Sequence, residues 1–139
     1  MKARLEALLM CDTIVLAPDG KIQLQGIFDR IFAASLPASH RIAWLYFRFV
    51  LEKPKAPYSV VHFSINRPNG LAEKMAELKV PVAADGKVEG SVALQNFPLH
   101  GEGYHSIDLY IGDEKVGSYR FLVELVKSGL GAKRHESLN

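Results

Sequence analysis

The chain has 139 residues, the length of one ordinary domain, and its 48% hydrophobic content argues against a disordered chain. Its formal net charge is +2, from 17 basic and 15 acidic residues. That balance argues against nucleic-acid binding, which needs several cations on one face, whereas the basic cluster here is only Lys133-Arg134 in a polar tail.

The single cysteine, Cys11, cannot form an internal disulfide, so the fold does not depend on an oxidising compartment. No apolar run approaches the ~20 residues that span a bilayer. Lys2 and Arg4 begin the chain as in a signal peptide, but Glu6 interrupts the short apolar stretch that follows. We therefore expect a cytoplasmic protein with no membrane partner.

Alternation with a period of two dominates the sequence and predicts strands. In residues 3–12 one parity carries Leu5, Ala7, Leu9 and Cys11. A helix competes there, because Ala, Leu, Met and Glu are good helix formers. We favour a strand because Pro18-Asp19-Gly20 follows, and Asp-Gly is typical of a hairpin turn.

The next strand is predicted from about Lys21 to Ala33, which is long. Before Gly26 the apolar residues are even-numbered, and after it the first is Ile27. A parity change at an internal glycine indicates a β-bulge or bend. Pro37 then ends the element, because proline donates no ladder hydrogen bond. The whole stretch therefore reads as a bent strand and an exit loop.

Residues 41–52 and 58–66 predict two strands with apolar faces, Leu45, Phe47, Phe49 and Leu51 on the first and Val61, Phe63 and Ile65 on the second. Residues 71–80 have a helical composition. However, Asn69-Gly70 before them and Pro81 after them favour an edge strand, on which charges discourage pairing between molecules.

A short strand is expected through Val92 and Leu94, and the chain closes with a clear hairpin. Its two apolar faces carry Ile107, Leu109 and Ile111, and Tyr119, Phe121, Val123 and Leu125. About seven to eight strands with regular turns predict an all-β, immunoglobulin-like antiparallel β-sandwich. Tyr104, after Gly101 and Gly103, resembles a tyrosine corner. We expect one domain over residues 1–127 and a flexible tail over 128–139.

The sequence offers little chemistry, and we expect no catalytic residue, no metal site and no cofactor. Cys11 lies on an apolar parity, which favours an inert packed thiol. The local polar cluster is His100, Glu102 and His105, the basis of an enzyme hypothesis that ranks third. The aspartates are scattered, mostly in turns whose geometry already explains them.

Residues 41–52 are bulky on both parities, which leaves an outer face with aromatic and cationic side chains. If the strands are neighbours, that face forms a binding patch of Trp44, Tyr46, Arg48, His62 and Tyr110. Trp, Tyr and Arg concentrate binding energy at interfaces. The alternative is that a loop, the first strand or the 71–80 segment covers this face.

The chain also resembles a family of small uncharacterised bacterial proteins. The resemblance rests on Cys11-Asp12, Asp19-Gly20-Lys21, Gly26-Ile27-Phe28-Asp29, Pro37, His40 and the C-terminal hairpin. It implies a β-sandwich with no assigned activity, and it supplies no catalytic residue.

Together these observations predict a non-enzymatic binding or assembly module with a protein partner, one that self-associates through a sheet face or edge. The alternative is a small-ligand or carbohydrate-binding domain in which Trp44 and Tyr46 act as stacking platforms.

Overall fold

A computed structural model describes residues 2–126, and these residues form strands and no helix. They therefore contain no helix that could cross a membrane. The prediction of an all-β fold is confirmed, and the expected tail, 128–139, lies outside the described residues. The nine strands are β1 (Ala3–Leu16), β2 (Ile22–Ile27), β3 (Arg30–Ala33), β4 (Ala38–Leu51), β5 (Tyr58–Asn66), β6 (Ala72–Pro81), β7 (Lys87–Leu99), β8 (Gly103–Ile111) and β9 (Glu114–Leu125).

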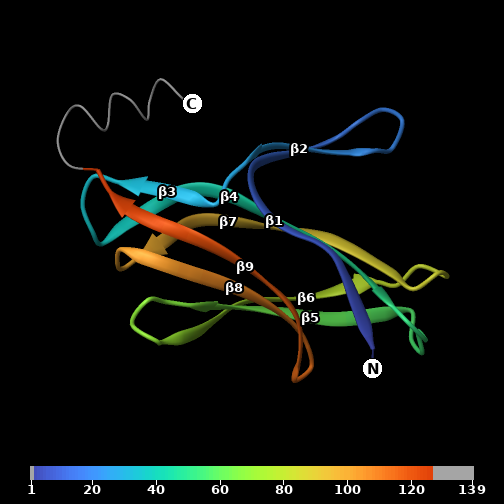
Figure 1. Ribbon diagram of the computed structural model, residues 1–139. Coiled ribbons are helices and arrows are strands. Elements are labelled where there is room, and N and C mark those ends of the chain that lie inside the picture. The colour runs from blue at the N-terminus through green and yellow to red at the C-terminus, as the bar shows by residue number, and fades with distance from the viewer. Residues whose placement is uncertain (1, 127–139) are drawn as a thin grey trace.

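The strands form two sheets that pack face to face as stacked layers (Figure 1). The four-stranded sheet has the order β2-β1-β4-β7, and the five-stranded sheet has the order β3-β9-β8-β5-β6. All neighbouring strands are antiparallel except β3 and β9, which run parallel. The architecture is therefore a β-sandwich, with one parallel pair added to the antiparallel arrangement that the sequence predicted.

The core lies between the two sheets and is built from the alternate residues that the sequence pattern marked. The predicted faces of β4 and β5 are buried, as are Ile107 and Leu109 of β8 and Phe121 and Val123 of β9. The two sheets meet through aromatic rings, with Phe47 edge-on to Phe63 at 5.4 Å between centroids. Each such side chain stabilises the fold by about 1.5–3 kcal/mol on burial.

The first strand forms as predicted, but its inward parity was wrong beyond Leu5. A bulge between Leu5 and Ala7 shifts the register against β4, so Leu8 and Met10 face the core. A bulge adds one residue to one strand, and every later side chain then changes face. Cys11 is fully buried, in agreement with the expected packed thiol.

The long second strand predicted from Lys21 to Ala33 is two strands in different sheets. Gly26 has a φ of +70°, a conformation that side chains disfavour, and β2 ends one residue later. The chain then crosses the sandwich at Phe28 and Asp29 and enters the five-stranded sheet as β3. The split of this segment explains why there are nine strands rather than seven or eight.

Three further expectations can be compared with the structure. Residues 71–80 form β6, an edge strand as predicted. The short strand expected at Val92 and Leu94 is the 13-residue β7. The tyrosine-corner interpretation of Tyr104 is wrong, because its side chain is 54% exposed and packs under the guanidinium of Arg120 instead of turning into the fold.

Candidate functional site

The five residues predicted to form one patch lie on two different sheets. Trp44, Tyr46 and Arg48 belong to β4 of the four-stranded sheet, whereas His62 and Tyr110 belong to β5 and β8 of the five-stranded sheet. The prediction of a single patch is therefore wrong. The residues are separated because the connection over residues 52–57 carries the chain from one sheet to the other instead of forming a hairpin.

The β4 group forms a closed polar network on the outer face of its sheet. Tyr46 is only 8% exposed, and its hydroxyl donates a hydrogen bond to the Glu89 carboxylate on β7. Burial and then Glu89 raise the pKa of Tyr46 to about 12. Arg48 Nε donates to Glu6 Oε1 over 2.7 Å. These groups bind one another, and Tyr46 presents little ring surface to a ligand.

The second group lies on the outer face of the five-stranded sheet, where His62 and Tyr110 stack at 4.9 Å with 4° between their planes. Next to them Asp108 is only 3% exposed. Its carboxylate accepts hydrogen bonds from Asn66 Nδ2 at 2.5 Å and from the Ser118 hydroxyl. The sequence analysis gave this aspartate no particular role, but its hydrogen bonds link β8 to β5 and β9.

The polar cluster that motivated the enzyme hypothesis does not converge. His105 is buried and its Nδ1 lies 3.0 Å from the Gly103 carbonyl oxygen. Glu102 accepts a hydrogen bond from the backbone N–H of Leu125, and His100 is exposed. Among residues 2–126 no group of three or more histidines, cysteines and carboxylates could hold a metal ion. The contacts of Glu102 and His105 are structural.

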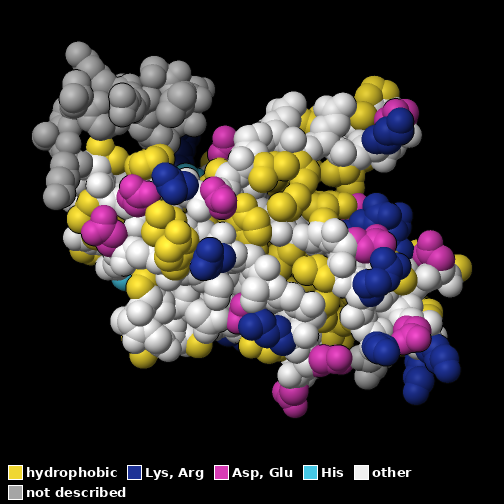
Figure 2. Space-filling view, viewed as in Figure 1, with side chains coloured by type: hydrophobic (Ala, Val, Ile, Leu, Met, Phe, Trp, Pro, Cys, Tyr) yellow, Lys and Arg dark blue, Asp and Glu magenta, His cyan; other side chains and the backbone are white. Residues whose placement is uncertain are grey.

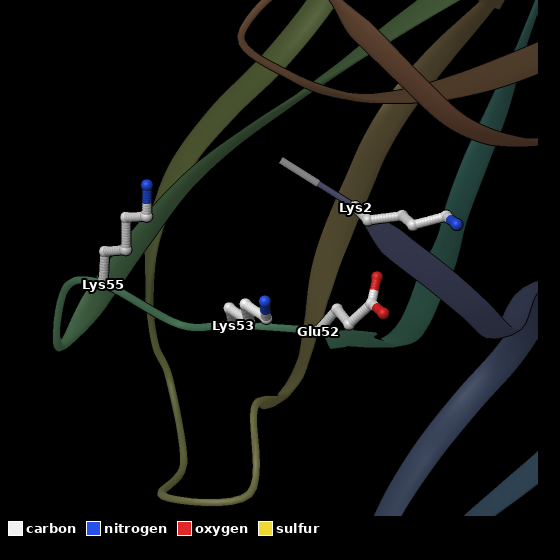
Figure 3. A pocket seen from close by; sticks show the side chains of 4 residues that line it. All are labelled: Lys2, Glu52, Lys53 and Lys55. Carbon is white, nitrogen blue, oxygen red and sulfur yellow. The ribbon is translucent and has the colours of Figure 1, made fainter.

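A hollow of about 280 Å³ lies beside the N-terminus, between Lys2 and the loop that follows β4 (Figure 3). It is lined by Lys2, Glu52, Lys53 and Lys55, all of them exposed. Figure 3 shows that their side chains point in different directions instead of toward one point. Solvated lysines of this kind do not make a built binding site.

A more unusual surface is the hairpin that joins β1 and β2, which projects from one end of the sandwich (Figure 1). We call its residues 13–25 the hairpin arm. Leu16 pairs with Ile22 and Ile14 pairs with Leu24, so these four side chains share one face. The other face carries Thr13 opposite Gln25 and Val15 opposite Gln23. The arm is therefore apolar on one side.

The apolar face of the arm continues the inner face of the four-stranded sheet. Leu8 and Met10 face the core, and Ile14 and Leu16 have the same parity farther along β1. Here the side chains are open to solvent: Leu16 is 72% exposed and Ile22 is 39% exposed. In Figure 2 hydrophobic side chains gather where the arm leaves the body, with charged side chains at its tip.

The sequence contained a signal for this surface that was overlooked. No charge occurs between Asp12 and Asp19, nor between Lys21 and Asp29. The prediction recognised the hairpin but treated its apolar residues as part of the core pattern. Their exposure could not be seen, because it depends on where the opposite sheet ends.

The strand edges differ in how they are protected against pairing with another chain. Four strands of the described chain lie at edges: β2, β7, β3 and β6. Edge strands are protected by charge, proline or short length. Charges line β6, β3 has four residues, and β7 carries Lys87, Glu89 and Pro98. In contrast, β2 has the sequence IQLQGI, with none of these protections.

Solved structures of larger proteins contain a similar sandwich. The alkylpurine DNA glycosylase AlkC of Pseudomonas fluorescens, bound to DNA with an abasic site analog, matches with a TM-score of 0.53 and 14% identity over 88% of this chain and 30% of its own. A β-glucosidase of Listeria innocua gives 0.54 and 10%, over 88% and 16%. The β-D-glucoside glucohydrolase of Trichoderma reesei gives 0.56 and 9%, over 88% and 19%.

The chain thus spans less than a third of each of these proteins, and at such low identity the likeness shows the fold alone. No curated protein matches the chain. One family does match, over residues 6–124, and it is described as a family of unknown function, DUF6941. Because the match covers most of the sequence, this chain belongs to the DUF6941 family.

Proposed function

We propose that this protein is a non-enzymatic assembly module that self-associates through the hairpin arm. Two copies pack the apolar faces of their arms together around a two-fold axis. The observation that carries the proposal is the exposure of Leu16 and Ile22 on a face that otherwise continues the core. Exposed apolar surface of this kind, grouped on one element, is typical of an interaction site.

A second copy suits the arm because both surfaces are then apolar and uncharged. The facing residues Ile14, Leu16, Ile22 and Leu24 bury no charge when they meet their own equivalents. The charges of the tip, Asp19 and Lys21, neutralise each other within one arm, with Nζ 3.7 Å from the carboxylate. In a two-fold interface each of these residues acts twice.

The energies favour a reversible dimer. Burying an exposed Leu or Ile side chain completely contributes about 1.5–3 kcal/mol. Association costs about 4–15 kcal/mol in lost freedom of motion. The eight side chains, four from each arm, are only partly exposed, so the gain from burying them is of the same order as that cost, and we expect a weak dimer that dissociates on dilution.

The test compares two lysine substitutions at neighbouring positions of one strand. Leu16→Lys places a charge on the apolar face, and Val15→Lys places the same charge on the opposite face of the arm. Sedimentation velocity over a wide concentration range measures the association. We expect dimers for the wild type and for Val15→Lys, and monomers for Leu16→Lys. A wild-type monomer at every concentration, or equal association of both variants, would refute the proposal.

The carbohydrate alternative loses one of its two stacking residues, because only Trp44 of the pair is partly exposed. A stacking platform needs aromatic faces that are open to solvent, and Tyr46 is buried and held by Glu89. The compartment that we propose for the assembly is the bacterial cytoplasm, because the lone thiol of Cys11 is packed in the fold and no internal disulfide is needed.

A further inference from the structure

A second feature, far from the arm in sequence, is a pocket of about 260 Å³ between β6 and β7. These two edge strands belong to different sheets, so the sandwich is open between them. The wall is mixed: Leu94, Phe97 and Met75 contribute apolar groups, and Arg67, Glu73, Lys74 and Gln95 contribute polar groups. The volume lies just below the ~300–1,000 Å³ of typical small-molecule sites.

Arg67 is the unusual member of this pocket. It follows β5 directly, and its side chain is only 8% exposed. A guanidinium has five N–H donors. Here Nη2 has a long contact of 3.4 Å with Glu73, a side chain that is itself 66% exposed, and Nη1 is buried with no hydrogen-bond partner in the described chain.

A buried cation with so little compensation is costly to the fold. Removing a charge from water costs several kcal/mol unless an anion and hydrogen bonds replace the hydration. His105, which is close enough to Arg67 to feel its charge, brings no negative charge, and its own Nε2 is also without a partner. Arg67 therefore keeps one buried N–H group without an acceptor, and its one ion pair in the described chain is a long contact with an exposed carboxylate.

We propose that this pocket binds a small monocarboxylate with an apolar body, and that Arg67 holds the carboxylate. Guanidinium and carboxylate pair through two parallel hydrogen bonds. Because Nη1 is closed to solvent, binding requires the guanidinium to rotate about the Cδ–Nε bond until Nη1 and Nη2 face the pocket together. The carboxylate then replaces the long contact with Glu73.

The rest of the pocket selects the ligand's other end and its charge. Phe97 forms part of the wall and packs on Phe121 at 6.0 Å between centroids, which gives a rigid apolar surface for a hydrocarbon chain. Glu73 and Lys74 also line the pocket and offset each other, so Arg67 leaves one net positive charge, which suits a monocarboxylate better than a phosphate dianion. The site thus differs from the arm in both place and chemistry.

The test uses hexanoate as the probe and hexanamide as its neutral counterpart. Isothermal titration calorimetry and thermal melting are run on the wild type, on Arg67→Met, and on Arg120→Met, whose guanidinium lies over the Tyr104 ring instead of in this pocket. We expect saturable hexanoate binding and a rise in melting temperature for the wild type and Arg120→Met. We expect at least tenfold weaker binding for Arg67→Met and for hexanamide.

The ligand-free variant gives an independent measurement. Replacing an uncompensated buried charge by an apolar side chain of similar length is neutral or stabilising, so Arg67→Met should melt at or above the wild-type temperature. A clearly lower melting temperature would show that the fold already satisfies Arg67 and would overturn the proposal. Equal binding of hexanoate and hexanamide, inorganic phosphate binding more tightly than hexanoate, or undiminished binding by Arg67→Met would do the same.

Discussion

The junction between the hairpin arm and the sandwich is controlled by one glycine, and substituting it is the sharpest test of the fold. Gly26 has a φ of +70°. A Cβ added there would lie 2.8 Å from Cγ and 2.9 Å from Cβ of Asp12, and closer still to Oδ2. Gly20, at the tip of the same hairpin, has a φ of +87° but no atom within 4 Å of an added Cβ. The two glycines therefore share the backbone strain and differ in the steric conflict.

The magnitudes separate the two variants. A left-handed conformation costs an alanine about 1–2 kcal/mol, and the stiffer unfolded chain returns about 0.4–1 kcal/mol. Gly20→Ala should thus lower the free energy of unfolding by about 1 kcal/mol. Gly26→Ala adds an overpacking term of about 1–3 kcal/mol, because Cβ of Asp12 cannot rotate away. At ~2.1 cal/mol/K per residue, a difference of about 2 kcal/mol lowers the melting temperature of 139 residues by about 7 °C.

Urea unfolding followed by fluorescence measures both variants, since Trp44 is the single tryptophan and pairs with Cys11 beside this junction. Asp12→Ala provides a double-mutant cycle. It removes the carboxylate but leaves Cβ at 2.9 Å, so it should restore about 1 kcal/mol to Gly26→Ala. Equal unfolding free energies for Gly20→Ala and Gly26→Ala, or no coupling with Asp12, would show that the junction is not packed as described.

Two other predictions concern buried polar groups. Burial is the main reason that the pKa of Tyr46 is raised from 10.0 to about 12, so at intermediate pH the folded state keeps a proton that the unfolded state loses. The unfolding free energy should therefore fall as pH rises from about 10 toward 12. In Glu89→Gln, titration followed by tyrosinate absorbance should show a smaller rise in this pKa. Asp108→Ala should lower the free energy of unfolding in urea by about 1–3 kcal/mol, because Ser118 and the other donors lose their acceptor. The control is Asp113→Ala in an exposed turn, which should change the free energy of unfolding by less than about 0.5 kcal/mol.

The sequence predicted the sandwich and most of its core because alternation is a local property. Whether Phe47 and Phe49 share a face depends only on the two-residue repeat of their own strand. The parity of β1 failed at the bulge after Leu5, because that bulge is defined by the pairing of β1 with β4. Pairing partners are distant in sequence, and no residue in the segment marks the shift.

The candidate site was harder to predict because it depends on which sheet each strand joins. His62 and Tyr110 did come together, since β5 and β8 are neighbours. Trp44 lies on the other sheet, because the chain crosses over after β4. Arg67 lies just before the predicted Asn69-Gly70 turn, and its side chain, in the pocket between β6 and β7, is only 8% exposed. Such burial is a result of topology and is not encoded in the turn itself.

The parallel pairing of β3 with β9 has a consequence for how the chain folds as it is made. Arg30 lies opposite Leu122, so the contact joins residues separated by 122 − 30 = 92 positions. A ribosome adds about 5–20 residues per second. After β3 is synthesised, several seconds therefore pass before its partner strand β9 exists. The entropy cost of closing so long a loop makes this pairing a slow step. Nascent chains stalled before residue 114 should consequently hold β3 unpaired, with the rest of the five-stranded sheet missing its β9 neighbour.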